Sequence, residues 1–225
     1  MAGISPSLFK FLTDLGSNNN KEWFDTHKSR YQEEEKKFKM VCSEILTGLQ
    51  QTDQIEKMKV YRIYKDVRFS KDKTPYKTHR SANFTREGEA LRGGYFIKVS
   101  PEKSLMGGGF FMPNPSDLLR IRKEFDLDDE PIRSIMRDKK FAATFGTKFV
   151  PYNQVKTAPK GFSKEHPSID LIRNKSFFFE HEYATKEVFA DNFSQQVVTH
   201  FKLLRPYFDY MSEVLTTNLN GESLI

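Results

Sequence analysis

Cysteine is almost absent from this chain of 225 residues, in which Cys42 is the only one. A single thiol cannot form an internal disulfide, which is typical of a reducing compartment, so we expect a cytoplasmic protein. No apolar run approaches the roughly 20 residues of a membrane-spanning helix, so no membrane association is expected. The start of the sequence, MAGISPSLFKFL, lacks the basic region, long apolar core and cleavage site of a secretory signal.

Motifs that mark common catalytic and cofactor sites are also missing. The five histidines occur without an HExxH or CxxC pattern, so we predict no metal site. There is no P-loop and no GxSxG elbow, and we predict no cofactor. The glycine run at 107–109 lies in a strand context, which favours a bulge or a close backbone approach over a Rossmann loop. His181 lies between two glutamates, but adjacent strand residues point to opposite faces, which argues against a shared ligand set.

Hydrophobic periodicity predicts a single α+β domain over residues 1–225. Helical spacing runs from Ser5 to Leu49, with capping signals at Ser5 and Asn19. A last amphipathic segment is also helical, and Pro206 should divide it. No internal repeat or low-complexity linker indicates a domain boundary. We therefore expect an antiparallel sheet of about four to five strands, flanked by N-terminal and C-terminal helices.

A period of two predicts the strands. From Val60 to Ser70, apolar residues including Ile63, Val67 and Phe69 share one parity, so Phe69 is expected on an apolar face. The other predicted strands are Thr78–Arg86, Tyr95–Ser100, Leu105–Met112 and Ser176–Tyr183.

Positive charge is concentrated in one short segment. The chain has a net charge of +6, and residues 62–80, RIYKDVRFSKDKTPYKTHR, hold seven Lys or Arg and two Asp, which is 7 − 2 = +5. A basic segment of this density is compatible with an anionic partner.

The centre of this segment, DVRFSKDKTPYK at Asp66–Lys77, resembles the signature of an uncharacterised family, domain of unknown function 2461. Weaker echoes are NNNKEWF at Asn18–Phe24, GGGFFMPNP at Gly107–Pro115 and GFSKEHPSIDLI at Gly161–Ile172, so the resemblance covers almost the whole chain. It implies an α+β protein of about this length and no established activity. By motif match, it directs attention to Arg68, Phe69, Ser70, Asp72, Lys73, Pro75, Tyr76 and Lys77.

The residues themselves predict a binding site for an anionic, phosphorylated small ligand, centred on Arg68–Lys77. Arginine offers a planar fork, lysine a point charge, and serine and tyrosine neutral donors. Tyr76 is also a candidate for stacking on a base or sugar. The candidate ligand-binding residues are Arg62, Asp66, Arg68, Ser70, Asp72, Lys73, Tyr76, Lys77 and His79.

Hydrolytic chemistry is one extension of this hypothesis, and the sequence leaves open whether the protein is an enzyme. Asp66, Asp72 or His79 would supply a base beside the cationic site. His166, before an expected helix, would strengthen this hypothesis if it converged on Tyr76 and Arg68.

Two alternatives remain. The segment could bind nucleic acid, in which case further basic residues should extend the patch, namely Lys98, Lys103, Arg120, Arg122 and Lys123. The second alternative is a protein-interaction module in which the segment is purely structural. In that case Asp66 and Asp72 form ion pairs that hold a surface loop in place. Nothing in the sequence indicates the oligomeric state.

Overall fold

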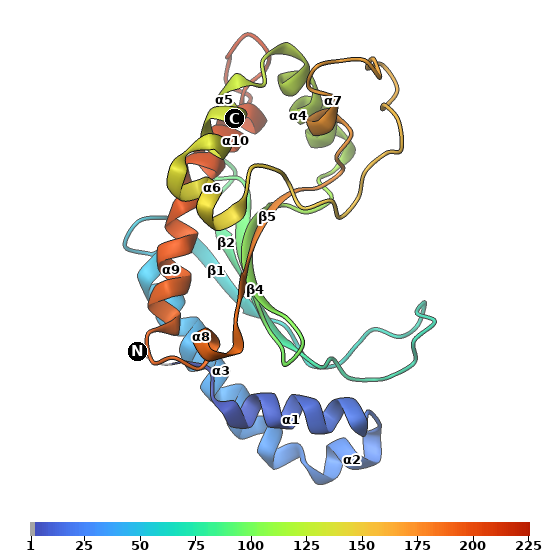
Figure 1. The fold of residues 1–225 in the computed structure, drawn as a ribbon, viewed down its shortest axis with the longest axis vertical. Coiled ribbons are helices and arrows are strands. Elements are labelled where there is room, and N and C mark those ends of the chain that lie inside the picture. The colour runs from blue at the N-terminus through green and yellow to red at the C-terminus, as the bar shows by residue number, and fades with distance from the viewer. Residues whose placement is uncertain (1–2) are drawn as a thin grey trace. The chain divides into compact units, whose positions relative to one another are not determined.

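The computed structural model describes residues 3–225 and shows an α+β fold built on one antiparallel sheet (Figure 1). The strand order in the sheet is the order in the sequence, as in a meander. The five strands are β1 (Ile55–Val60), β2 (Arg80–Arg86), β3 (Gly94–Val99), β4 (Ser104–Phe110) and β5 (Phe177–Tyr183). The predicted fold class and strand number are confirmed.

Four of the predicted strands coincide with β2, β3, β4 and β5 to within two residues at each end. The prediction of a strand over Val60–Ser70 is wrong. Strand β1 ends at Val60, and the chain from residue 61 to residue 79 forms no strand beyond an isolated bridge between Tyr64 and Tyr76.

Contacts divide the chain into two compact units. Unit 1 comprises the described residues up to Phe84, together with Phe96–Met106 and Glu182–Thr199. Unit 2 comprises Thr85–Tyr95, Gly107–His181 and His200–Ile225. The extent of a single domain over residues 1–225 stays a prediction.

Three helices open unit 1, and their buried faces follow the helical period of the sequence. Ser5 caps the first helix, because its hydroxyl accepts a hydrogen bond from the backbone N–H of Ser7 at 3.3 Å. Cys42 is fully buried, and burial raises the pKa of its thiol to about 12, which fits the packed, unreactive thiol that its sequence context indicates. The helices of this unit are α1 (Pro6–Ser17), α2 (Lys21–Thr26), α3 (Lys28–Leu49), α8 (Thr185–Val188) and most of α9 (Phe193–Leu203).

The cap of α2 differs from the prediction. Asn20, not Asn19, accepts a hydrogen bond from the backbone N–H of Trp23, at 2.9 Å. The Asn19 amide instead forms two hydrogen bonds with the backbone of Tyr76: it accepts from the N–H at 3.0 Å and donates to the carbonyl at 2.9 Å. Asn19 therefore connects the first helices to the basic segment.

Unit 2 combines an aromatic core with short helices. Its helix α10 begins at Arg205, directly after α9 ends at Leu203, so the predicted division at Pro206 is confirmed.

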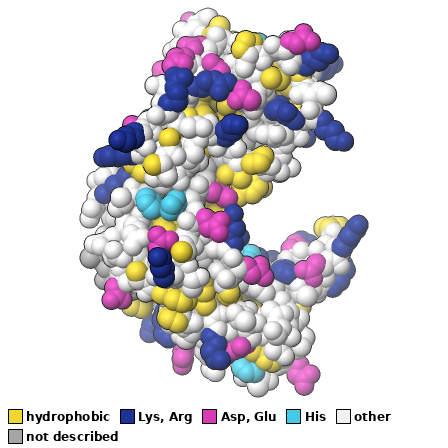
Figure 2. Space-filling view, viewed as in Figure 1, with side chains coloured by type: hydrophobic (Ala, Val, Ile, Leu, Met, Phe, Trp, Pro, Cys, Tyr) yellow, Lys and Arg dark blue, Asp and Glu magenta, His cyan; other side chains and the backbone are white. Residues whose placement is uncertain are grey.

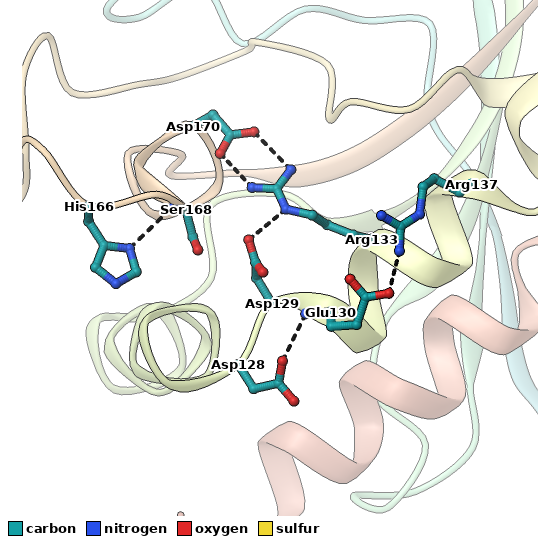
Figure 3. A network of polar contacts seen from close by, with 8 residues as sticks. All are labelled: Asp128, Asp129, Glu130, Arg133, Arg137, His166, Ser168 and Asp170. Atoms are coloured by element: carbon teal, nitrogen blue, oxygen red, sulfur yellow. Dashed lines mark hydrogen bonds and ion pairs between the residues drawn. The ribbon is translucent and has the colours of Figure 1, made fainter.

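Figure 3 shows Arg133 between Asp129 and Asp170, to which it donates hydrogen bonds at 2.6 and 2.8 Å. The helices of this unit are α4 (Pro115–Leu127), α5 (Glu130–Arg137), α6 (Lys139–Phe145), α7 (Ile169–Ile172) and α10 (Arg205–Thr216).

The glycine run in β4 is explained by close backbone packing. A Cβ atom at Gly107 would lie 2.3 Å from the carbonyl oxygen of Phe179, and one at Gly109 would lie 2.2 Å from that of Phe177. The predicted close approach of two backbones is confirmed.

Among residues 3–225, none of the helices combines the length and the apolar character that a membrane-spanning helix requires.

Candidate anion-binding arm

The basic segment forms a loop that extends away from the helices of unit 1 (Figure 1, teal). We call residues 61–79, between β1 and β2, the arm. At its base, the two sides pair through backbone hydrogen bonds from Lys65 to Pro75 and from Lys77 to Ile63, both 2.8 Å. The arm is therefore ordered at its base.

Tyr76 anchors the arm in the core of unit 1. Its ring is 3% exposed and stacks on Phe24, with the ring centroids 4.1 Å apart. Ile63, which is also in the arm's base, is fully buried as well. A buried, stacked ring offers no free face to a ligand, so the predicted stacking of Tyr76 on a base or sugar is wrong.

Both carboxylates of the arm form ion pairs within it. Asp66 accepts from Nε and Nη2 of Arg68 at 3.0 and 2.6 Å, and Asp72 accepts from Nζ of Lys65 at 2.8 Å. Hydrogen bonds from Arg68 hold the pKa of Asp66 below its usual range, and those from Lys65 and Thr74 hold the pKa of Asp72 far below it. Both groups are weak bases in this state, which gives the hydrolytic hypothesis little support.

Four cations of the arm remain without a carboxylate partner among residues 3–225. Lys73 donates only to the carbonyl of Val67, at 3.0 Å, and Lys77 to that of Arg62, at 3.1 Å. These hydrogen bonds orient the two ammonium groups but leave their charge uncompensated. The four cations are Arg62, Lys71, Lys73 and Lys77.

Phe69 occupies the outer part of the arm and is 98% exposed. The expectation of an apolar strand face containing Phe69 is wrong, because the Asp66–Arg68 pair bends the chain where the strand was predicted. The Arg68 guanidinium carbon lies 6.0 Å from the ring centroid. In Figure 2 the outer part of the arm presents dark-blue basic side chains next to a yellow hydrophobic one, and magenta acidic side chains are also visible on the arm. Asp66 and Asp72 flank Phe69 in the sequence, and aspartate favours turns. These two residues are the sequence signal that Phe69 lies at the tip of a loop.

His79 lies where the positive charges of the arm's base converge. Burial, followed by the charges of Lys98, Lys77, Arg80 and Lys65, lowers the pKa of its imidazole to about 4. The ring is thus neutral at pH 7, in a region that favours a negative charge.

Arg80 joins the arm to helix α3. Its side chain is 1% exposed, and its Nε and Nη2 donate to the Glu35 carboxylate at 2.7 and 2.8 Å. Nη2 also donates to the carbonyl of Tyr61 at 2.6 Å. This buried pair fixes the point at which the arm leaves the sheet.

The remaining predicted residues are distributed between the units. Ser70 is exposed, and its backbone N–H donates to Val67 at 3.4 Å. Lys98 lies near His79, whereas Lys103 pairs with Glu182 at 3.2 Å. In unit 2, Arg120 and Arg122 donate to backbone carbonyls, and Lys123 also belongs to α4. Lys98 is therefore close to the arm's base, whereas Arg120 and Arg122 are engaged with backbone carbonyls of unit 2, and the extension of the patch stays a prediction.

His166 takes part in polar contacts of unit 2. Its Nδ1 accepts a hydrogen bond from the backbone N–H of Ser168 at 3.1 Å, as Figure 3 shows. Its Nε2 lies 3.6 Å from Asp126. These contacts are those of a local loop residue ahead of α7.

Comparison with protein families matches residues 7–210 to the family described as "Conserved hypothetical protein (DUF2461)". The chain belongs to this family. The match includes the whole arm and confirms the resemblance carried by DVRFSKDKTPYK. No curated protein and no solved structure matches the chain significantly. The family description names no activity.

The lowered pKa of His79 predicts a loss of stability on acidification. An unfolded histidine binds a proton below pH 6.5, whereas the folded ring does so only near pH 4. Between these values the unfolded state holds more protons, so the free energy of unfolding falls as the pH falls from 6.5 to 4. Because the ring is only partly buried, we expect a loss on the order of 1 kcal/mol.

Urea denaturation of the wild type and of His79→Gln across this pH range measures the effect. The free energy of unfolding of the wild type minus that of His79→Gln should decrease as the pH falls from 6.5 to 4. A difference independent of pH would mean that His79 titrates normally in the folded protein.

Proposed function

We propose that the arm binds a single-stranded nucleic acid. The observation that carries this proposal is Phe69, an aromatic side chain 98% exposed on a segment with four cations that lack carboxylate partners. Proteins that bind single strands combine cations, which follow the phosphates, with aromatic rings, on which bases stack. An exposed Phe ring has no role in the core, and burying it against a base would contribute about 1–3 kcal/mol.

The exposure of the arm's outer residues favours an extended ligand over a small one. A pocket for a small molecule encloses most of the ligand's surface. Arg68 has a side chain that is 77% exposed, and it faces solvent together with Phe69. The ion pairs of Asp66 and Asp72 shape the arm, and the unpaired cations are left for the phosphates.

Fluorescence anisotropy with a labelled oligothymidylate tests this proposal. Phe69→Ala should weaken binding by about 5- to 150-fold, the equivalent of losing one stacked base. Lys73→Gln should weaken binding less and should lower the slope of log affinity against log salt by about 0.7, as expected for one lost phosphate contact. Lys186→Gln, which removes an exposed lysine of α8, serves as the matched control and should have little effect.

Two results would contradict the proposal. The first is no binding of the wild type at low salt, and the second is equal binding by the wild type and by Phe69→Ala. If Lys73→Gln lowers stability without changing any binding, the arm is structural, as in the protein-interaction alternative.

A small phosphorylated ligand is the second candidate, and the surroundings of His79 favour it. The charges of Lys77 and Lys98 both lower the pKa of this imidazole, and neither lysine has a carboxylate partner among residues 3–225. An anion bound here would stabilise the protonated ring, so inorganic phosphate should raise the pKa of His79 in an NMR titration. In this case Lys77→Gln should abolish the effect and Phe69→Ala should not.

A further inference from the structure

Unit 2 contains a cavity of about 300 Å³ that is separate from the arm. It lies between α4, the start of α5, α10 and the C-terminal segment 217–225, elements that meet near the C-terminus in Figure 1. Its size falls at the lower end of the range for small-molecule sites. The family match ends at residue 210, so part of the cavity wall is built from sequence outside that match.

The C-terminal segment folds back to form one wall of the cavity. Thr217 and Ser223 form an antiparallel bridge, and the backbone N–H of Asn218 donates to Glu222 at 2.9 Å. Gly221 makes the turn possible with a φ of +79°, in the left-handed region that favours glycine. Arg120 ties this wall to α4, because its Nε donates to the carbonyl of Thr217 at 3.0 Å.

The charged residues of the lining leave an excess of negative charge. Arg120 is already paired with Glu124 at 2.7 Å, and its other hydrogen bonds go to backbone carbonyls. Glu213 is exposed and has no ion-pair partner among residues 3–225. An anion would meet no available cation here, whereas a cation would meet an uncompensated carboxylate.

Tyr210 also lines the cavity, through its ring. Its hydroxyl oxygen is buried and has no hydrogen-bond partner within residues 3–225. Burial, with Glu124 and Asp128 nearby, raises the pKa of this phenol, so it stays neutral. Because this oxygen is enclosed by the protein, a ligand in the cavity would meet the ring of Tyr210 and not its hydroxyl.

Two leucines provide an apolar surface at the same place. Leu127 is 70% exposed and Leu219 is 45% exposed, although both line the cavity. Pro131 and Val214 complete the apolar part of the lining. A ligand with an apolar body would cover these side chains and gain from their burial.

We propose that this cavity binds a small organic cation, in which an ammonium or guanidinium group is attached to an apolar body. The cationic group would donate to the Glu213 carboxylate. The apolar body would lie against Leu127 and Leu219. The ring of Tyr210 adds a face suited to a cation.

Isothermal titration calorimetry with the full chain tests this inference. The probes are 2-phenylethylamine, hexylamine and hexylguanidine, and 2-phenylethanol is the neutral isostere. At least one cationic probe should bind saturably, and 2-phenylethylamine should bind at least about tenfold more tightly than the alcohol.

Two variants connect binding to the cavity. Glu213→Gln should weaken the cationic probes by about tenfold, which is the loss of one hydrogen bond to a charged group. Tyr210→Phe removes a buried hydroxyl that has no partner and keeps the ring, so it should bind like the wild type, and its melting temperature should stay equal or rise. Asp191→Asn, which removes an exposed acid of unit 1, should bind like the wild type.

The inference would be overturned if none of the three cations binds saturably. It would also be overturned if amine and alcohol bind equally, or if Glu213→Gln keeps the wild-type affinity.

Discussion

Glu35→Ala should lower the free energy of unfolding by about 3–5 kcal/mol. The reason is the guanidinium that it leaves behind. Arg80 is 1% exposed, and Glu35 neutralises it through two hydrogen bonds of 2.7 and 2.8 Å. Its Nη1 already has no hydrogen-bond partner within residues 3–225. Without the carboxylate, a buried positive charge would remain uncompensated.

The effect of Glu35→Ala should be largely removed by a second change. In the double variant Glu35→Leu/Arg80→Met, both charges are replaced by apolar groups, so stability should return to within about 1–2 kcal/mol of the wild type. Lys39→Gln is the matched control, because Lys39 is exposed and lies 3.8 Å from the same carboxylate. It should change stability by less than about 0.5 kcal/mol.

Urea denaturation of these four proteins provides the measurement. A loss below about 1 kcal/mol in Glu35→Ala would contradict the burial of Arg80, because a hydrated guanidinium tolerates the loss of one partner. Because Arg80 also donates to the carbonyl of Tyr61, the arm should become more susceptible to proteolysis in Glu35→Ala.

Gly109→Ala should destabilise the protein by at least about 3 kcal/mol, and folded protein should be scarce. Two independent effects combine at this position. The added Cβ would lie 2.2 Å from the carbonyl oxygen of Phe177, which belongs to the backbone of a neighbouring strand and cannot rotate away. Gly109 also has a φ of +143°, which side chains rarely adopt.

Two other glycines separate the effects. Gly107→Ala tests the clash, since its Cβ would lie 2.3 Å from the carbonyl oxygen of Phe179 without a positive φ. Gly88→Ala tests the backbone conformation, since its φ is +70° and no atom lies within 4 Å of the added Cβ. We expect Gly88→Ala to cost about 1–2 kcal/mol and both β4 variants to cost more, as measured by thermal unfolding. If Gly109→Ala is no worse than Gly88→Ala, the close packing of β4 on β5 is contradicted.

Local patterns predicted most of the secondary structure. The strands β2, β3, β4 and β5 and the division at Pro206 follow from period-two alternation and from the chemistry of proline, which act over a few residues. The cap at Ser5 is equally local. The cap of α2 is not, because Asn19 and Asn20 are chemically identical candidates. Contact with Tyr76, which is distant in the sequence, decided that Asn20 caps the helix.

The arm shows where local patterns fail. Alternation of apolar residues from Ile63 to Phe69 is real, but a strand forms only if a partner strand accepts its hydrogen bonds. The ion pair of Asp66 and Arg68 and the backbone pairing at Tyr64 and Tyr76 favour a loop instead. Phe69 is therefore at the outside of the molecule, and Tyr76 is in its core.

The sequence by itself determined the α+β class, the family and the position of the basic segment, because each depends on residue types at short spacing. Only the tertiary structure decided which charges are available. Asp66, Asp72 and Glu35 neutralise three of the basic residues, whereas Arg62, Lys71, Lys73 and Lys77 have no carboxylate within ion-pair distance among residues 3–225. The cavity beside Tyr210 also depends on tertiary structure, since α4, α10 and the C-terminal segment form it together. Pairing and burial depend on distances between residues far apart in the chain, which composition and periodicity do not contain.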